Sequence, residues 1–168
     1  MIEVLPGDGF IVDTENLYSK IIKIGQRWTD KNENCWGTHG GFIVSPNGAT
    51  MEALWKVRNA HITDYIGKRV LIFRHKDMTP EKFDYSFRKI FQEHWGQTYP
   101  FYRPLYILSP VLCKAFTKKA VCTELEAKFF WYLGMMPHWR GVTPDNIADQ
   151  VCFYSRHGLW QIIYDGVL

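Results

Sequence analysis

The sequence predicts an α+β domain in which an antiparallel sheet packs against helices. The expected elements run in the order helix, strands, helices and strands, rather than as regular βαβ repeats. The turn sequence Ser45-Pro46-Asn47-Gly48 joins two apolar segments as an antiparallel hairpin. Two later segments begin with a capping threonine and a proline, at Thr79-Pro80-Glu81 and Thr143-Pro144-Asp145. These three observations favour an α+β fold, in which strands and helices occupy separate parts of the chain.

Short apolar runs bounded by turn residues predict the strands. They are Phe10–Val12, His39–Val44, Ala49–Val57, Arg69–Arg74, Val151–Ser155 and Trp160–Asp165. Apolar residues spaced three or four apart, together with capping residues, predict the helices. These comprise a helix capped by Thr14 with Leu17, Ile21 and Ile24, a helix from Thr79 to Gly96 with Phe83, Phe87, Ile90, Phe91 and Trp95 as its core face, a short helix around Leu112 in the mixed segment Tyr99–Lys119, Cys122–Leu133 ended by Gly134, and a short helix opened by Thr143.

The composition is that of one globular domain covering residues 1–168. Hydrophobic residues make up 46% and charged residues 22% of the 168 residues, so a substantial core is expected. The net charge of +3 is scattered, with no basic run longer than Lys118-Lys119, which argues against nucleic-acid binding. The N-terminus lacks the features of a signal peptide, and no apolar run approaches the roughly 18 residues of a membrane span. We therefore expect a chain that is cytoplasmic as synthesised.

The four cysteines are expected to be reduced thiols. The sequence contains no CxxC pair, the pattern typical of a zinc site, and a domain of this length does not need disulfides for stability. A thiol attacks only as thiolate, which a helix N-terminus or a nearby imidazole stabilises. Cys122 begins an expected helix, whereas Cys35, Cys113 and Cys152 lie in a loop, an apolar run and a strand. Cys122 is thus the candidate nucleophile, and the alternative is a small buried apolar residue.

His39 is the candidate base among six histidines. It begins an expected strand in which Gly40-Gly41 let other backbone approach closely. The hairpin can bring Glu52 across from the start of that strand, where a carboxylate would hold the Nδ1 proton and favour the imidazolium. Judged alone, such a histidine is more often a surface or structurally bonded residue, and Glu52 is as typical of an outward-facing strand position.

Several short motifs, taken in order, resemble the permuted NlpC-type papain-like proteins. That family includes the YiiX-like hydrolases and, more distantly, lecithin retinol acyltransferase. In its permuted branch the histidine strand precedes the cysteine helix, as it does here. The matching motifs span residues 6–146 and are Pro6-Gly7-Asp8-Gly9-Phe10-Ile11-Val12, Thr38-His39-Gly40-Gly41-Phe42-Ile43-Val44, Thr50-Met51-Glu52-Ala53, Val121-Cys122-Thr123-Glu124-Leu125 and Thr143-Pro144-Asp145-Asn146.

The resemblance implies a circularly permuted papain-like fold and a cysteine hydrolase of peptidase or amidase type. It implies Cys122 as nucleophile, His39 as base and Glu52 as the group that orients the base. An amide or ester acyl group would be cleaved or transferred through a thioester, and family substrates include peptidoglycan stem-peptide bonds and lipid acyl groups. The chain departs from the family at Val121 and Gly40, where relatives often carry an aromatic and an apolar residue.

The oxyanion donors stay open at this point. The backbone N–H of Cys122 is one physically reasonable donor. The family often has a tyrosine upstream of the cysteine helix, which makes Tyr99 or Tyr102 a second candidate for contact with the oxyanion or substrate.

Three other functions are weighed against the leading one, an amide hydrolase acting on a cell-wall peptide in a phage setting suggested by analogy. A lipid acyl hydrolase or acyltransferase would use exposed aromatics, and the run Phe129–Tyr132 could line a groove or simply pack in the core. A binding or structural module would keep the fold without turnover. A metal site using Cys35 and His39 lacks a second pair of ligands. No nucleotide motif is present, and no cofactor is expected.

Overall fold

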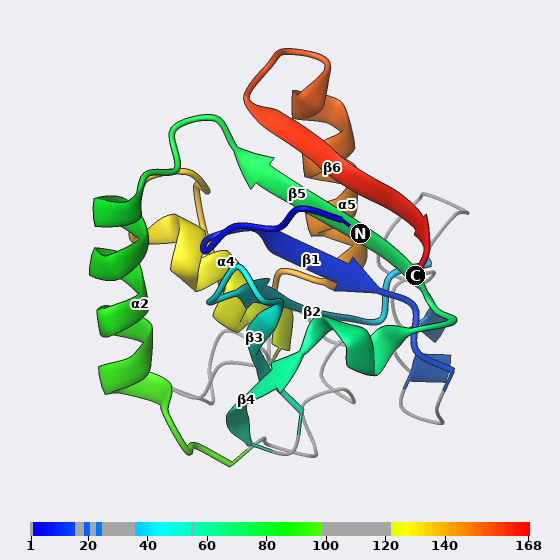
Figure 1. The fold of residues 1–168 in the computed structure, drawn as a ribbon, viewed down its shortest axis with the longest axis horizontal. Coiled ribbons are helices and arrows are strands. Elements are labelled where there is room, and N and C mark those ends of the chain that lie inside the picture. Colours follow the sequence, from blue (N-terminus) through cyan, green and yellow to red (C-terminus); the bar gives the residue numbers. More distant parts are fainter. Residues whose placement is uncertain (1, 16–18, 21–22, 25–35, 55, 99–121) are drawn as a thin grey trace.

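The computed structural model describes residues 2–15, 19–20, 23–24, 36–54, 56–98 and 122–168. Its centre is a six-stranded antiparallel sheet with strand order β4-β3-β2-β1-β5-β6 (Figure 1). The strands are β1 (Gly9–Val12), β2 (His39–Ile43), β3 (Ala49–Ala53), β4 (Val57–His61), β5 (Arg69–His75) and β6 (Trp160–Val167). The described helices are α2 (Pro80–His94), α4 (Cys122–Trp131), α5 (Pro144–Ser155) and the short 3-10 helix η1 (Ile62–Tyr65). The predicted α+β class with an antiparallel sheet is confirmed.

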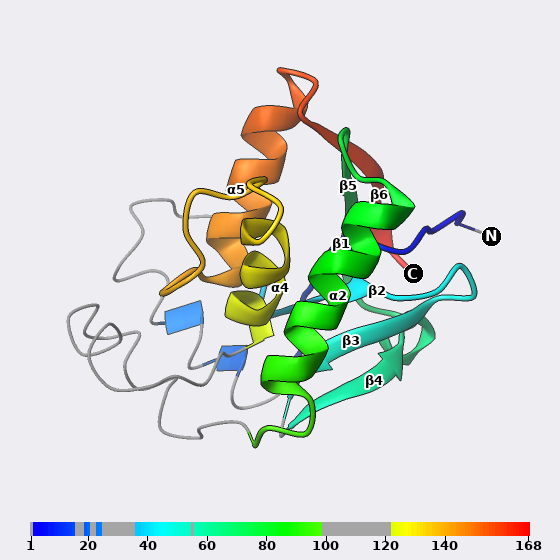
Figure 2. The ribbon, with the colours of Figure 1, turned by 90° about the vertical axis from the view of Figure 1, so that its left-hand side faces the viewer.

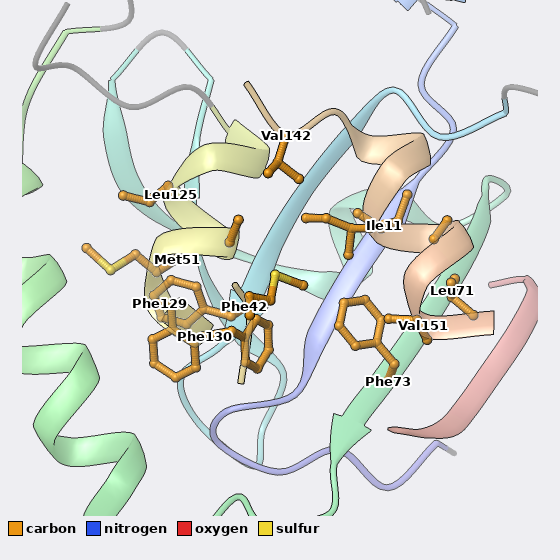
Figure 3. Close-up of a cluster of buried hydrophobic side chains, with 14 of the residues drawn as sticks. Ile11, Phe42, Met51, Leu71, Phe73, Leu125, Phe129, Phe130, Val142 and Val151 are labelled. Atoms are coloured by element: carbon orange, nitrogen blue, oxygen red, sulfur yellow. The ribbon is translucent and has the colours of Figure 1, made fainter. Parts of the chain in front are cut away.

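Both faces of the central strands are covered. Helices α4 and α5 lie over one face of the sheet, and α2 lies beside α4 (Figure 2). On this side Ile11, Phe42 and Phe73 of the sheet meet apolar side chains of the helices in the main core (Figure 3). Successive strand residues point to opposite faces, so Phe10 and Val12 belong to a second, smaller core. Polar groups on β1 and β2 are therefore held away from water.

Helix α4 runs alongside β2, so residues one turn apart on the helix lie against residues two positions apart on the strand. The ring of Phe129 stacks on Phe42 with centroids 4.2 Å apart. One turn earlier, the carboxylate of Glu126 lies against Gly40, where an added Cβ would be 2.5 Å from Oε2. The absence of a side chain at Gly40 thus permits the close approach of helix and strand. The start of α4 is thereby brought to the start of β2.

Substitution of Gly40 by alanine is expected to destabilise the fold by about 1–3 kcal/mol, because the methyl group overpacks this contact. The new Cβ would also lie 2.8 Å from Cδ1 of Ile11 and 3.0 Å from the carbonyl oxygen of Phe10. Urea denaturation measures the loss of stability. In a Glu126→Ala background the loss should be smaller, since the nearest clash is gone. An equal loss in both backgrounds would contradict this account of the helix contact.

The prediction of a strand over Val151–Ser155 is wrong, because these residues complete α5. Thr143 and Asn146 form a reciprocal capping box, with both N–H···O distances 3.2 Å. Ile147 and Val151, four residues apart, are fully buried, so the apolar side of the segment follows a helical period. The apolar and aromatic residues at its end resemble a strand only when read in isolation.

The single strand predicted over Ala49–Val57 is also wrong. The chain turns after β3 and returns as β4, with Ala53 opposite Val57. The intervening sequence Leu54-Trp55-Lys56 contains no turn-forming residue, so the sequence carries no signal for this hairpin. One consequence is that Arg58 lies directly across from Glu52.

The helix predicted from Thr79 is present as α2, but its apolar stripe is only partly a core face. Ile90 is fully buried, whereas Phe91 and Trp95 are 41% and 44% exposed. Helix α2 approaches α4 near Ser86, whose hydroxyl donates to the carbonyl oxygen of Phe129 at 2.6 Å. The stripe is longer than this contact, and Phe91 and Trp95 stack on each other beyond it, with ring centroids 4.8 Å apart.

Two predicted helices cannot be compared in full. Leu17 and Ile21 of the first, and the segment Tyr99–Lys119 with its expected helix around Leu112, lie outside the described residues. The cysteine helix ends at Trp131, and a turn carries the chain to Gly134, which has φ of +68°. Within the described ranges, no helix combines the length and hydropathy needed to cross a bilayer.

Candidate active site

Cys122 lies at the start of α4 and is 5% exposed. Backbone N–H groups in the first turn of a helix lack intrahelical partners, and their partial positive charge stabilises an anion. The side chain of Cys122 lies near enough to that of His39 to raise the pKa of the imidazole. Cys122 therefore has both devices that stabilise a thiolate, a helix N-terminus and an imidazole.

The pairing of β2 and β3 brings His39 and Glu52 together. Glu52 lies opposite Gly41, two residues after His39, so both side chains share one face of the sheet. Glu52 Oε2 is 3.0 Å from His39 Nε2. The expectation that the carboxylate would hold Nδ1 is therefore wrong, because the contact is diagonal and the ring atom farther from the backbone reaches it. Nδ1 is then the nitrogen that can exchange a proton with Cys122.

Two further side chains hold the carboxylate of Glu52, which is fully buried. The hydroxyl of Tyr65, at the end of η1, donates to the same oxygen that contacts His39. Arg58 Nη2 donates to the other oxygen at 3.2 Å from the neighbouring strand β4. Burial and the negative charge of Glu52 raise the pKa of Tyr65, so its phenol stays a neutral donor. Glu52 is thus fixed from three directions.

The electrostatics of the site favour a charged imidazole. Burial lowers the pKa of His39, but hydrogen bonds with Cys122 and Glu52, together with their charges, outweigh burial and raise it to about 10. Burial raises the pKa of Glu52, and hydrogen bonds from His39 and Tyr65 with the nearby positive charges bring it below its ordinary value. The imidazolium of His39 and the carboxylate of Glu52 are therefore the charge states that their surroundings favour.

Sequence reasoning missed Arg58, Tyr65 and Glu126. Arg58 would have been found opposite Glu52 had the hairpin between β3 and β4 been recognised. Tyr65 contacts Glu52 from 13 positions away, and no local pattern marks that contact. Glu126 looks like a surface residue in the sequence, yet it is fully buried on α4.

Of the other residues that the sequence analysis considered for the site, the structure describes Cys152. Cys152 is exposed on α5 instead of lying in a strand, and burial of part of its side chain, with the charge of Asp165, raises its pKa. It therefore lacks the surroundings of a reactive thiol. The remaining residues lie outside the described ranges: Tyr99, Tyr102, Val121, Cys35 and Cys113.

A solved structure resembles this architecture over almost its whole length. The match is to the crystal structure of the metalloprotein YiiX from Escherichia coli O157:H7, with a TM-score of 0.64 and 99% of each chain covered. The fold is YiiX-like. Sequence identity is 13%, so the YiiX-like fold is what this similarity establishes. No family model and no curated protein matches the sequence.

The residues of the site do not fit a metal ion. Among the residues that the structure describes, no three or more His, Cys, Asp or Glu side chains form a group that could hold one. Glu52 is occupied by His39, Arg58 and Tyr65 instead of presenting a free oxygen pair. Cys35, which the sequence paired with His39 as a possible metal site, lies outside the described residues. The description of YiiX as a metalloprotein has no counterpart in these donor atoms.

Proposed function

We propose that this chain is a cysteine hydrolase with a circularly permuted papain-like fold of the NlpC type, and that it cleaves an amide bond. The observation that carries the proposal is the buried succession of side chains from Cys122 through His39 to Glu52. The YiiX-like fold and the position of the histidine strand before the cysteine helix support it.

In the first half of the reaction, the thiolate of Cys122 attacks the substrate carbonyl carbon and forms a C–S bond. The carbonyl electron pair moves to oxygen, for which the backbone N–H of Cys122 is a donor. The intermediate then collapses, the C–N bond breaks, and His39 gives its proton to the leaving amine. The product of this half is a thioester acyl-enzyme and a neutral imidazole.

In the second half, water attacks the thioester while neutral His39 takes one of its protons. The C–S bond breaks, the carboxylic acid leaves, and Cys122 returns to thiolate beside the imidazolium. Glu52 holds Nε2 throughout, which leaves Nδ1 as the ring nitrogen available to Cys122 and stabilises the positive charge. Each group therefore ends in the state in which it began.

A peptide amide, such as a cell-wall peptide, is the substrate class we propose, with a phage setting as an analogy. The lipid alternative depended on the aromatic run of the cysteine helix. Phe129 and Phe130 are fully buried in the main core, and Trp131 is 41% exposed. The run therefore mainly serves packing, and nothing in it favours a lipid substrate.

Acyl-enzyme capture tests the proposal. The protein is mixed with peptide amides, peptidoglycan fragments and acyl lipids, quenched in acid, and examined by intact and peptide mass spectrometry. We expect a hydroxylamine-sensitive adduct on Cys122 from a peptide amide, absent in Cys122→Ala. An adduct only from acyl lipids would replace the substrate class. No adduct on Cys122 from any member of the panel would favour the non-catalytic binding module.

A further inference from the structure

Glu126 is a buried carboxyl group one helical turn after Cys122. Residues four apart lie on the same side of a helix, so the carboxyl group and the thiol are neighbours along α4. The group fits because both facing strands carry glycine: an added Cβ would lie 2.7 Å from Oε1 at Gly9 and 2.5 Å from Oε2 at Gly40. Gly40 directly follows His39. The sequence thus makes room for a carboxyl group beside the catalytic pair.

Among the described residues, this carboxyl group has no ion-pair partner. Neither oxygen has a hydrogen-bond partner among the described residues, and no ion pair there includes Glu126. Charged groups on the elements around α4 already have partners: Asp8 with Arg74, Glu52 with His39, Asp145 with the backbone N–H of Trp36, and Glu93 with Lys128. An ionised carboxylate in such a place would be costly, since burial without a partner disfavours charge.

The surroundings therefore favour the protonated form of Glu126. Burial raises its pKa well above the ordinary value, and the charge of Cys122 raises it further, against a smaller lowering by the backbone of Phe10. Coupling between two titrating groups is reciprocal, so a charge on Glu126 must equally oppose the thiolate of Cys122.

We propose that Glu126 is a positioning residue for Cys122, which permits the thiolate while protonated and suppresses it when ionised. This role rests on the proposed function. When Glu126 loses its proton, two negative charges would face each other across one helical turn. The least costly response is return of the imidazolium proton from His39 to sulfur, which leaves a thiol and a neutral imidazole. Activity should therefore end on the alkaline side as Glu126 ionises.

The test compares the pH dependence of Cys122 alkylation by iodoacetamide in the wild type, Glu126→Gln and Glu124→Gln. Glutamine keeps the shape of Glu126 but cannot ionise. We expect the wild-type rate to fall by roughly tenfold on the alkaline side, the size of a screened like-charge contact, and the fall to vanish in Glu126→Gln. Glu124 is the matched control, because it is also buried on α4 but accepts the backbone N–H of Gly141 at 2.8 Å. Its variant should keep the wild-type profile.

A second readout does not depend on the folding of Glu126→Gln. Carbon-13 NMR of carboxyl-labelled glutamate in the wild type should show one carboxyl group still protonated at neutral pH, with a midpoint that falls in Cys122→Ala. Full ionisation of every glutamate at neutral pH would overturn the role of Glu126. If the wild-type thiol is reactive at low pH but the alkylation rate of Glu126→Gln falls on the alkaline side as the wild-type rate does, the role of Glu126 is overturned and the proposed function stands. A wild-type thiol that is unreactive at low pH would refute the proposed function, and this role with it.

Discussion

Replacement of Cys122 by alanine is expected to reduce kcat/KM for amide hydrolysis by about four orders of magnitude or more. The reason is that Cys122 is the described thiol that begins a helix and that raises the pKa of His39. The fold should survive, because removing one buried sulfur leaves a small cavity worth about 1 kcal/mol. Steady-state kinetics and thermal unfolding measure the two effects separately.

Cys152→Ala is the matched control for that experiment. Its thiol is exposed on α5 and has no imidazole partner among the described residues. Activity should be unchanged in this variant. Hydrolysis that persists in Cys122→Ala, or that disappears in Cys152→Ala, would remove Cys122 as the nucleophile.

Replacement of His39 by alanine is expected to lower kcat by about 10²–10⁴-fold, the range attributed to general acid–base catalysis. Glu52→Gln should lower it by a smaller factor, because glutamine can still accept a hydrogen bond from His39 Nε2 but supplies no charge. Rates for both variants on the same peptide amide provide the comparison. An equal or greater loss at Glu52 would show that the carboxylate does more than orient the base.

The pair formed by His39 and Glu52 also sets a pH window for stability. The pKa of His39 is raised from 6.5 to about 10, so its contribution is fully present below pH 6.5 and lost as pH rises through about 10. The pKa of Glu52 is lowered from 4.5, so its contribution is present above that value and lost as pH falls further. Urea denaturation across this range should show the largest gap between wild type and Glu52→Gln between pH 4.5 and 6.5, where both contributions are fully present.

Local signals in the sequence predict much of what positions the site. The turn Pro46-Asn47-Gly48 fixes the hairpin, and the alternation of side chains along paired strands puts His39 and Glu52 on one face. The capping threonines locate α2 and α5, and the start of α4 is visible in the residues after Cys122.

The remainder depends on contacts between distant segments. Arg58 reaches Glu52 through a hairpin that lacks turn residues, and Tyr65 reaches it from η1. The burial of Glu126 follows from β1 and β2 packing beside a helix whose residues Cys122–Phe130 are buried throughout. A charged residue in such a helix looks solvent-exposed until its neighbours are known.

The most direct test of the central claim is the pH dependence of cysteine alkylation, resolved by residue, in the wild type and in His39→Ala. If His39 and Cys122 form an ion pair, Cys122 alone should react well below the ordinary thiol pKa of about 8.5, and His39→Ala should abolish that reactivity. If Cys122 instead titrates like Cys152, or reacts equally well without His39, the pair is not catalytic and the hydrolase assignment fails.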